Sequence, residues 1–180
     1  MKAHWTARLA REDDIPALEE LIPLSVRGLR AHFYSAAQVD AALGSVFGVD
    51  RQLIRDQTYF VVEAENEIIG CGGWSKRKTL FGSDHQTNRD DAELDPAKEP
   101  ARIRAFFIHP TRARRGIARA ILEECEKAIR TAGFKSIELA ATLPGEPFYA
   151  GCGYVSGERS SVPLSDNLNL PIVHMNKTLR

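Results

Sequence analysis

The clearest hydrophobic pattern in the chain lies between residues 116 and 133. Apolar or small side chains recur there every three or four residues, the spacing of one helix face; they are Ile117, Ile121, Leu122, Cys125, Ala128, Ile129 and Ala132. Gly133 follows at the position where a glycine commonly ends a helix. The pattern therefore predicts an amphipathic helix that begins after Gly116 and ends before Gly133.

Segments with strand-like composition lie on both sides of this helix. The run IRAFFIHP (103–110) is rich in apolar residues and ends at a proline, and SIELAAT (136–142) follows the helix. After it, PFYAGCG (147–153) is typical of a short helical turn. The order predicts a β-loop-α-β core.

Further strands are predicted upstream and in the tail. TYFVVEA (58–64) and IIGCGGW (68–74) are separated by a polar turn, which favours a hairpin. YVSGE (154–158) and LPIVHMNK (170–177) predict one or two more strands.

The first third of the chain is predicted to be mostly helical, after a short strand at 5–8. One helix is capped by Asp13 or Asp14, with Pro23 leaving its end open; its apolar positions are Ile15, Leu18, Leu21 and Ile22. Ser35 caps a second helix that is predicted to run through Phe47 and to end at Gly48.

Residues 76–100 are charged and irregular. A loop of this length inside a compact domain is typically functional or mobile. Two interpretations stay open: a solvated surface loop, and a lid that faces the substrate.

Composition supports one globular domain over residues 1–180, and the predicted order of strands and helices gives it a mixed α/β (α+β) class. The 180 residues are 43% hydrophobic, enough for one sizeable core but too few for two typical domains. Lys+Arg and Asp+Glu both number 24, so no excess charge favours nucleic acid or an anionic membrane. We expect no nucleic-acid or membrane partner.

The N-terminus lacks the apolar core of a signal peptide, and no apolar stretch approaches the roughly 18 residues of a membrane span. The three cysteines, Cys71, Cys125 and Cys152, show no zinc-ligand spacing, and an odd number suits reduced thiols. These observations predict a cytoplasmic protein without a metal.

Four arginines gather around Gly116, between the strand that ends at Pro110 and the N-terminus of the main helix. A helix N-terminus carries unsatisfied N–H groups and a partial positive charge, so cations there are mildly disfavoured. A bound phosphate or pyrophosphate would explain them, since Gly116 and Ala118 let the backbone approach. The alternative is a solvated, arginine-rich helix start.

The stretch from Arg102 to Tyr154 resembles the acetyl-CoA core of the GNAT N-acetyltransferase superfamily, with FFIHP, an RRGIA turn, the amphipathic helix, a strand and then FYAGCGY. The family's turn reads Gln/Arg-x-x-Gly-x-Gly/Ala. Gly116 and Ala118 match it, whereas Ala113 departs from its first position.

The resemblance implies a strongly twisted mixed sheet flanked by helices and acetyl-CoA as co-substrate. By resemblance, the CoA pyrophosphate would be held by Arg114, Arg115, Gly116, Ile117, Ala118 and Arg119. Phe106, Phe107 and Ile108 would offer backbone groups to the pantetheine arm, which behaves like an added strand. For the side chains of the two phenylalanines, core packing is the better interpretation.

Acyl transfer to an amine needs a proton donor for the leaving thiolate and an acceptor for the amine proton. By resemblance, Tyr149 is the candidate acid, because FYAGCGY matches the family's FYxxxG(F/Y) pattern; the alternative is a packing tyrosine. The family's common Asn before this turn is replaced around Leu143, Pro144 and Gly145.

Glu138 matches a glutamate that serves as base in ribosomal-protein acetyltransferases of this superfamily, and a surface glutamate is an equally good interpretation. His109 precedes a proline and suits a turn, and Cys152 lacks a paired histidine. A backbone N–H near Phe107 or Ile108 is the predicted oxyanion donor.

The sequence therefore predicts an N-acetyltransferase that moves an acetyl group from acetyl-CoA to a primary amine of a small molecule or protein. A non-catalytic acyl-CoA-binding regulatory module and an unrelated nucleic-acid-binding domain are the alternatives. The acceptor pocket is expected between the helical first third and residues 76–100. The oligomeric state is open, with a homodimer as one option.

Overall fold

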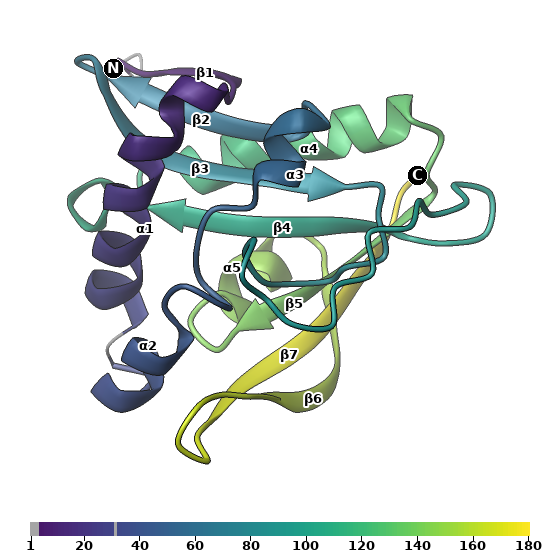
Figure 1. Cartoon of the computed structure of the whole chain (residues 1–180). Coiled ribbons are helices and arrows are strands. Elements are labelled where there is room, and N and C mark those ends of the chain that lie inside the picture. The colour runs from purple at the N-terminus through teal and green to yellow at the C-terminus, as the bar shows by residue number, and fades with distance from the viewer. Residues whose placement is uncertain (1–3, 31) are drawn as a thin grey trace.

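The computed structural model describes residues 4–30 and 32–180 and contains one seven-stranded mixed sheet in the order β1-β2-β3-β4-β5-β7-β6 (Figure 1). The strands are β1 (Thr6–Leu9), β2 (Tyr59–Ala64), β3 (Glu67–Ser75), β4 (Ala101–Ile108), β5 (Ser136–Thr142), β6 (Val155–Pro163) and β7 (Asn169–Thr178). Neighbouring strands are antiparallel except β4 and β5, which are parallel. The predicted mixed α/β fold is confirmed.

Helices cover both faces of the sheet. The helices are α1 (Ile15–Arg30), α2 (Ala36–Ala42), α3 (Arg51–Arg55), α4 (Ile117–Thr131) and α5 (Glu146–Gly151), with 3₁₀ turns η1 (Glu12–Asp14) and η2 (Pro110–Arg112). In Figure 1, α1 and α2 lie in front of the sheet and α4 runs behind it. One hydrophobic cluster therefore forms on the α1 face and a second on the α4 face.

The sheet separates between β4 and β5. These two strands pair only at their first residues, Ala101 with Ile137 and Arg102 with Glu138. Beyond Arg102, β5 continues its pairing with β7, whereas the β5-facing edge of β4 has no strand partner among the described residues. The sheet thus opens into a V whose two arms are β4 and β5.

An irregularity in β4 decides which side chains face the opening. The register with β3 shifts between Cys71 and Gly73, and Ala105 adopts a left-handed backbone conformation with φ 57°. A β-bulge of this kind bends the strand and re-aims the residues that follow. As a result Phe107 packs into the α1-face cluster, and Phe106 packs against the α4-face cluster.

Most of the predicted elements are confirmed, including the hairpin, the strand 136–142 and both tail strands. The predicted central helix is α4, and Gly133 has φ 90°, as expected for a glycine that ends a helix.

The structure places one helix end that the sequence left open and corrects another. Helix α1 continues through Pro23 to Arg30, and apolar residues such as Val26 extend its buried face. Ser35 caps α2 as predicted, by accepting the N–H of Gln38 at 3.1 Å, but α2 ends at Ala42 rather than Phe47, because Leu43 turns to an extended conformation and Gly44 has φ 95°.

Candidate active site

A cavity of about 230 Å³ occupies the opening between β4 and β5. On the α4 face its wall includes Phe106, Ile108, Ala118, Phe148 and Tyr149. On the α1 face it is lined by residues of α1, of the loop after α2, of the 80–82 segment and of β6 and β7. The cavity therefore connects the two faces of the sheet through the V.

The N-terminus of α4 lies at one end of this cavity, where Ala118 is part of the wall. Gly116 is the N-cap residue with φ 85°, Arg114 is also left-handed with φ 62°, and no side chain caps the helix. A side chain added at Gly116 would meet open space. The first amides of α4 are thus not covered by a side-chain cap, as an anion-binding helix start requires.

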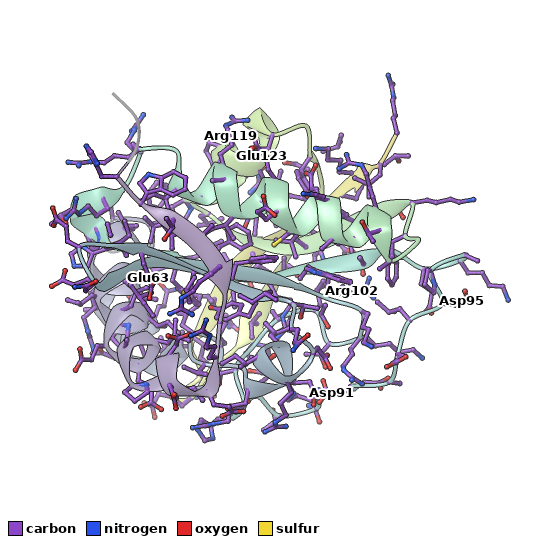
Figure 2. All side chains as sticks on the ribbon, turned by 90° about the horizontal axis from the view of Figure 1, so that it is seen from above. Glu63, Asp91, Asp95, Arg102, Arg119 and Glu123 are labelled. Atoms are coloured by element: carbon purple, nitrogen blue, oxygen red, sulfur yellow. The ribbon has the colours of Figure 1, made fainter. Side chains whose placement is uncertain are left out.

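The arginines at this end differ in their partners. Arg112 contacts Glu65 at 3.3 Å, whereas Arg114, Arg115 and Arg119 are exposed and form no ion pair with the described residues. Figure 2 shows Arg119 on the side of α4 that faces away from the sheet. Ile117 is buried on the other side of the helix. These three arginines are available to an anion.

The predicted cofactor strand, Phe106 to Ile108, lies beside the cavity, in the part of β4 that diverges from β5. The Phe107 side chain is buried and meets the Phe47 ring edge-on at 6.2 Å, in line with the core-packing interpretation. The Ile108 N–H donates to Ser25 Oγ at 3.0 Å. Ile108 is therefore engaged with α1 rather than open as an oxyanion donor.

Tyr149 lies on α5, where it is 8% exposed and lines the cavity. Its ring is fixed by edge contacts with Phe106 at 6.1 Å, Phe148 at 5.0 Å and Tyr154 at 5.7 Å.

Three tyrosines outside the cavity wall have structural hydrogen bonds. Tyr34 donates to Pro171 O at 2.7 Å, Tyr59 to Ala105 O at 2.8 Å, and Tyr154 to Glu126 Oε1 at 3.1 Å. Burial and the neighbouring Glu126 carboxylate raise the pKa of Tyr154 far above its usual value. Of the four tyrosines, Tyr149 is the one in the cavity wall.

The other residues considered for proton transfer or as a nucleophile are not in the cavity wall that the described residues form. Glu138 contacts Arg102 Nη1 at 2.5 Å, at the closed end of the V, and is not in the cavity wall formed by the described residues. His109 Nδ1 accepts the Thr111 N–H at 3.3 Å and so shapes the turn. Burial raises the pKa of the Cys152 thiol, which disfavours a thiolate nucleophile.

The structure adds residues that sequence reasoning missed. Ser25 lies in α1 beyond Pro23, where the sequence left the helix end open. Arg104 lines the cavity, is buried, and donates to Asp50 at 2.8 Å. Their partners lie 83 and 54 residues away in the chain, so no local motif signals either contact.

The described residues contain no group of three or more His, Cys, Asp or Glu side chains placed to hold a metal ion. Within the same residues, no helix is long and apolar enough to cross a membrane.

Comparisons with known proteins identify the fold. The model of the acetyltransferase (GNAT) family matches residues 27–154, more than two thirds of the chain. No curated protein sequence matched the chain.

Several solved structures share the fold at low identity. A GCN5-related N-acetyltransferase structure from Rhodopseudomonas palustris superposes with a TM-score of 0.72 at 17% identity, covering 99% of this chain and 98% of that one. The PaiA N-acetyltransferase of Thermoplasma acidophilum, solved with coenzyme A, gives 0.64 at 14%, covering 97% and 98%. The yncA protein of Salmonella typhimurium, solved with acetyl-CoA, gives 0.63 at 12%, covering 98% and 95%.

Proposed function

Because the chain belongs to the GNAT acetyltransferase family, we propose that it transfers an acetyl group from acetyl-CoA to a primary amine. The observation that carries this proposal is the cavity in the β4–β5 opening. It joins the uncapped N-terminus of α4 to Tyr149 and continues to the α1 face of the sheet. Two substrates can therefore meet in it from opposite faces.

The residues present fit the cofactor. The amides that begin α4, with Arg114, Arg115 and Arg119, would hold the pyrophosphate. Among the described residues, β4 has no strand partner on its β5 side at 106–108, so this segment would accept the pantetheine arm as an additional strand, except at the Ile108 N–H, which Ser25 already binds. When bound, acetyl-CoA supplies an acetyl group activated as a thioester.

The transfer forms a bond between the amine nitrogen and the acetyl carbon and breaks the bond between that carbon and sulfur. The amine loses one proton, and the departing thiolate gains one. We assign the proton that the thiolate gains to the hydroxyl of Tyr149, because tyrosine hydroxyls serve as general acids and the pocket places this one beside the opening. Its fixed ring keeps the hydroxyl in one place.

The acceptor of the amine proton has weaker support. Glu138 is the candidate by resemblance, but its carboxylate is paired with Arg102 outside the cavity wall. Water in the cavity is the alternative, since the opening exceeds the roughly 10–15 Å³ that one water needs.

Ligand-dependent melting tests the cofactor assignment. At about 100 times its dissociation constant, a ligand adds roughly 2.7 kcal/mol to the free energy of unfolding, which corresponds to about 5–10 °C in a protein of this size. We expect CoA and acetyl-CoA to raise the melting temperature, with ATP and NAD as controls. A rise with ATP or NAD but not with CoA would refute the proposal. Release of free CoA in the presence of amines then separates an enzyme from a non-catalytic acyl-CoA-binding module.

A further inference from the structure

The half of the cavity on the α1 face has apolar walls. Six of its side chains belong to, or pack against, the hydrophobic cluster of that face: Val46, Phe47, Phe81, Val162, Leu170 and Ile172. Because the cofactor is proposed to enter from α4, this half is where the acceptor would lie. The polarity and charge of this wall therefore indicate which kind of acceptor fits.

We propose that the acceptor is a small monoamine with an uncharged, apolar body; this inference rests on the proposed function. The amino group would meet the acetyl group at the opening of the V. The rest of the molecule would replace water against the apolar wall, which is favourable in proportion to the apolar area covered.

The charge in this wall is already neutralised, which disfavours an anionic acceptor. Arg104 is the charged side chain in the cavity wall among the described residues. Its guanidinium donates to Asp50 at 2.8 Å, to Thr79 O at 3.0 Å and to Gly82 O at 2.7 Å. A substrate carboxylate would have to compete with these buried contacts.

An acceptor with a second ammonium group is disfavoured for the complementary reason. No carboxylate side chain belongs to the cavity wall in the part of the chain that the structure describes. Nearby, Asp50 pairs with Arg104 and Arg89, Asp84 with Arg51 at 2.8 Å, and Asp91 with Arg89 at 3.0 Å. A second cation would lose its hydration without gaining a partner.

The size of the cavity favours a small acceptor. Its volume of about 230 Å³ is below the roughly 300–1,000 Å³ typical of pockets for drug-sized ligands, and the acetyl end of the cofactor shares it. The 80–82 segment closes one side of the cavity, and Arg104 holds this segment by donating to the carbonyl oxygens of Thr79 and Gly82. A compact amine therefore fits better than a peptide segment.

Three amines with the same six-carbon chain test the proposal: hexylamine, 1,6-diaminohexane and 6-aminohexanoate, which differ only in the end remote from the reacting amine. With saturating acetyl-CoA, we expect kcat/KM for hexylamine to exceed that of each charged analogue by at least about 10-fold. Equal or higher kcat/KM for either analogue would overturn the inference while leaving the proposed acetyl transfer intact. If none of the three reacts, calorimetry of hexylamine with the CoA complex decides, and absence of binding overturns the inference. Failure of CoA itself to bind would instead refute the proposed function.

A matched pair of variants locates the effect in the wall. Leu80 lines the cavity but is only half buried and belongs to neither hydrophobic cluster, so a polar side chain is tolerated there. We expect Leu80→Glu to raise the ratio of kcat/KM for 1,6-diaminohexane over hexylamine by about 10-fold or more, because it supplies a carboxylate. The glutamine of Leu80→Gln has the same shape as the glutamate but no charge, so this variant should change that ratio much less. Equal ratios in the two variants would contradict the assignment of this wall to the acceptor.

Discussion

At the scale of single residues, Tyr149 and Tyr154 form a natural comparison. Both rings are buried in the same aromatic group on the α4 face. Tyr154 donates its hydroxyl proton to Glu126, which is also bound by Lys177 at 2.8 Å, so this tyrosine belongs to a structural network. Tyr149 lines the cavity instead. The roles proposed for these two side chains therefore rest on the hydrogen-bond network at the Tyr154 hydroxyl and on the place of Tyr149 in the cavity wall.

Replacing Tyr149 by Phe removes the proposed proton donor and keeps the ring. We expect kcat to fall by about 10²- to 10⁴-fold, the contribution of a positioned acid, while CoA affinity changes less than about threefold. Tyr154→Phe is the control: it should keep kcat but lose roughly 1–3 kcal/mol of stability with its buried hydrogen bond. Steady-state kinetics and denaturant unfolding measure both variants. Wild-type kcat in Tyr149→Phe would remove this hydroxyl from the mechanism.

Glu138 is the other residue whose role can be tested alone. Because its carboxylate pairs with Arg102 at the closed end of the V, we expect Glu138→Gln to lower kcat by less than about threefold. A loss of about 100-fold or more, reversed at higher pH where the amine is less protonated, would instead assign the base to Glu138.

At the scale of elements, the start of α4 carries the cofactor assignment. Gly116 has a left-handed backbone, which favours glycine. A side chain added there would not clash, because the space around it is open. Asn and Asp tolerate that conformation better than other side chains, and they differ from each other in charge alone.

This difference gives a matched test of the pyrophosphate site. We expect Gly116→Asp to weaken CoA binding at least about 10-fold more than Gly116→Asn, since only the aspartate repels the phosphates. Calorimetric titration with CoA measures both, and raising the salt concentration should narrow the gap. Equal affinities in the two variants would move the pyrophosphate away from this helix.

Local patterns predicted the elements whose start and end signals lie in their own sequence. Helix α4 is an example, with its apolar face and Gly133, and so is the cap of α2 at Ser35. The predicted end of α2 was wrong. Apolar residues at 43, 46 and 47 continue the helical spacing in the sequence, but the chain turns at Gly44. The cavity wall could not be predicted, because the Asp50–Arg104 pair and the V between β4 and β5 depend on contacts between distant segments.

At the scale of the whole molecule, ion pairs join separate elements of the fold. Arg77 donates to both carboxylate oxygens of Asp56, linking the 76–100 loop to the end of α3, and Arg8 on β1 pairs with Asp14 at 2.8 Å. The hydrogen bonds from these guanidinium groups hold the pKa of Asp56 and of Asp14 below their usual values. Each carboxylate therefore favours the folded state when it is ionised.

The sign of these shifts predicts how stability depends on pH. A carboxyl group with a lowered pKa in the folded state contributes stability above its unfolded pKa, about 3.9, and this contribution is lost as the pH falls through the folded pKa. We expect the free energy of unfolding to decline between about pH 5 and pH 2. Asp56→Asn should be less stable than wild type at neutral pH, and the difference should shrink across that window. Denaturant unfolding at several pH values measures it; a difference that does not shrink with acid would contradict the contribution assigned to Asp56.

A crystal structure of the protein with CoA would test the central claim most directly. That claim is that the opening between β4 and β5 brings acetyl-CoA to Tyr149. The account predicts the pyrophosphate on the amides that begin α4, within residues 114–119. It also predicts the pantetheine arm along β4 at 106–108, where this strand diverges from β5, with the sulfur beside the Tyr149 hydroxyl. CoA bound with its arm outside the opening, or with its sulfur remote from Tyr149, would contradict the account.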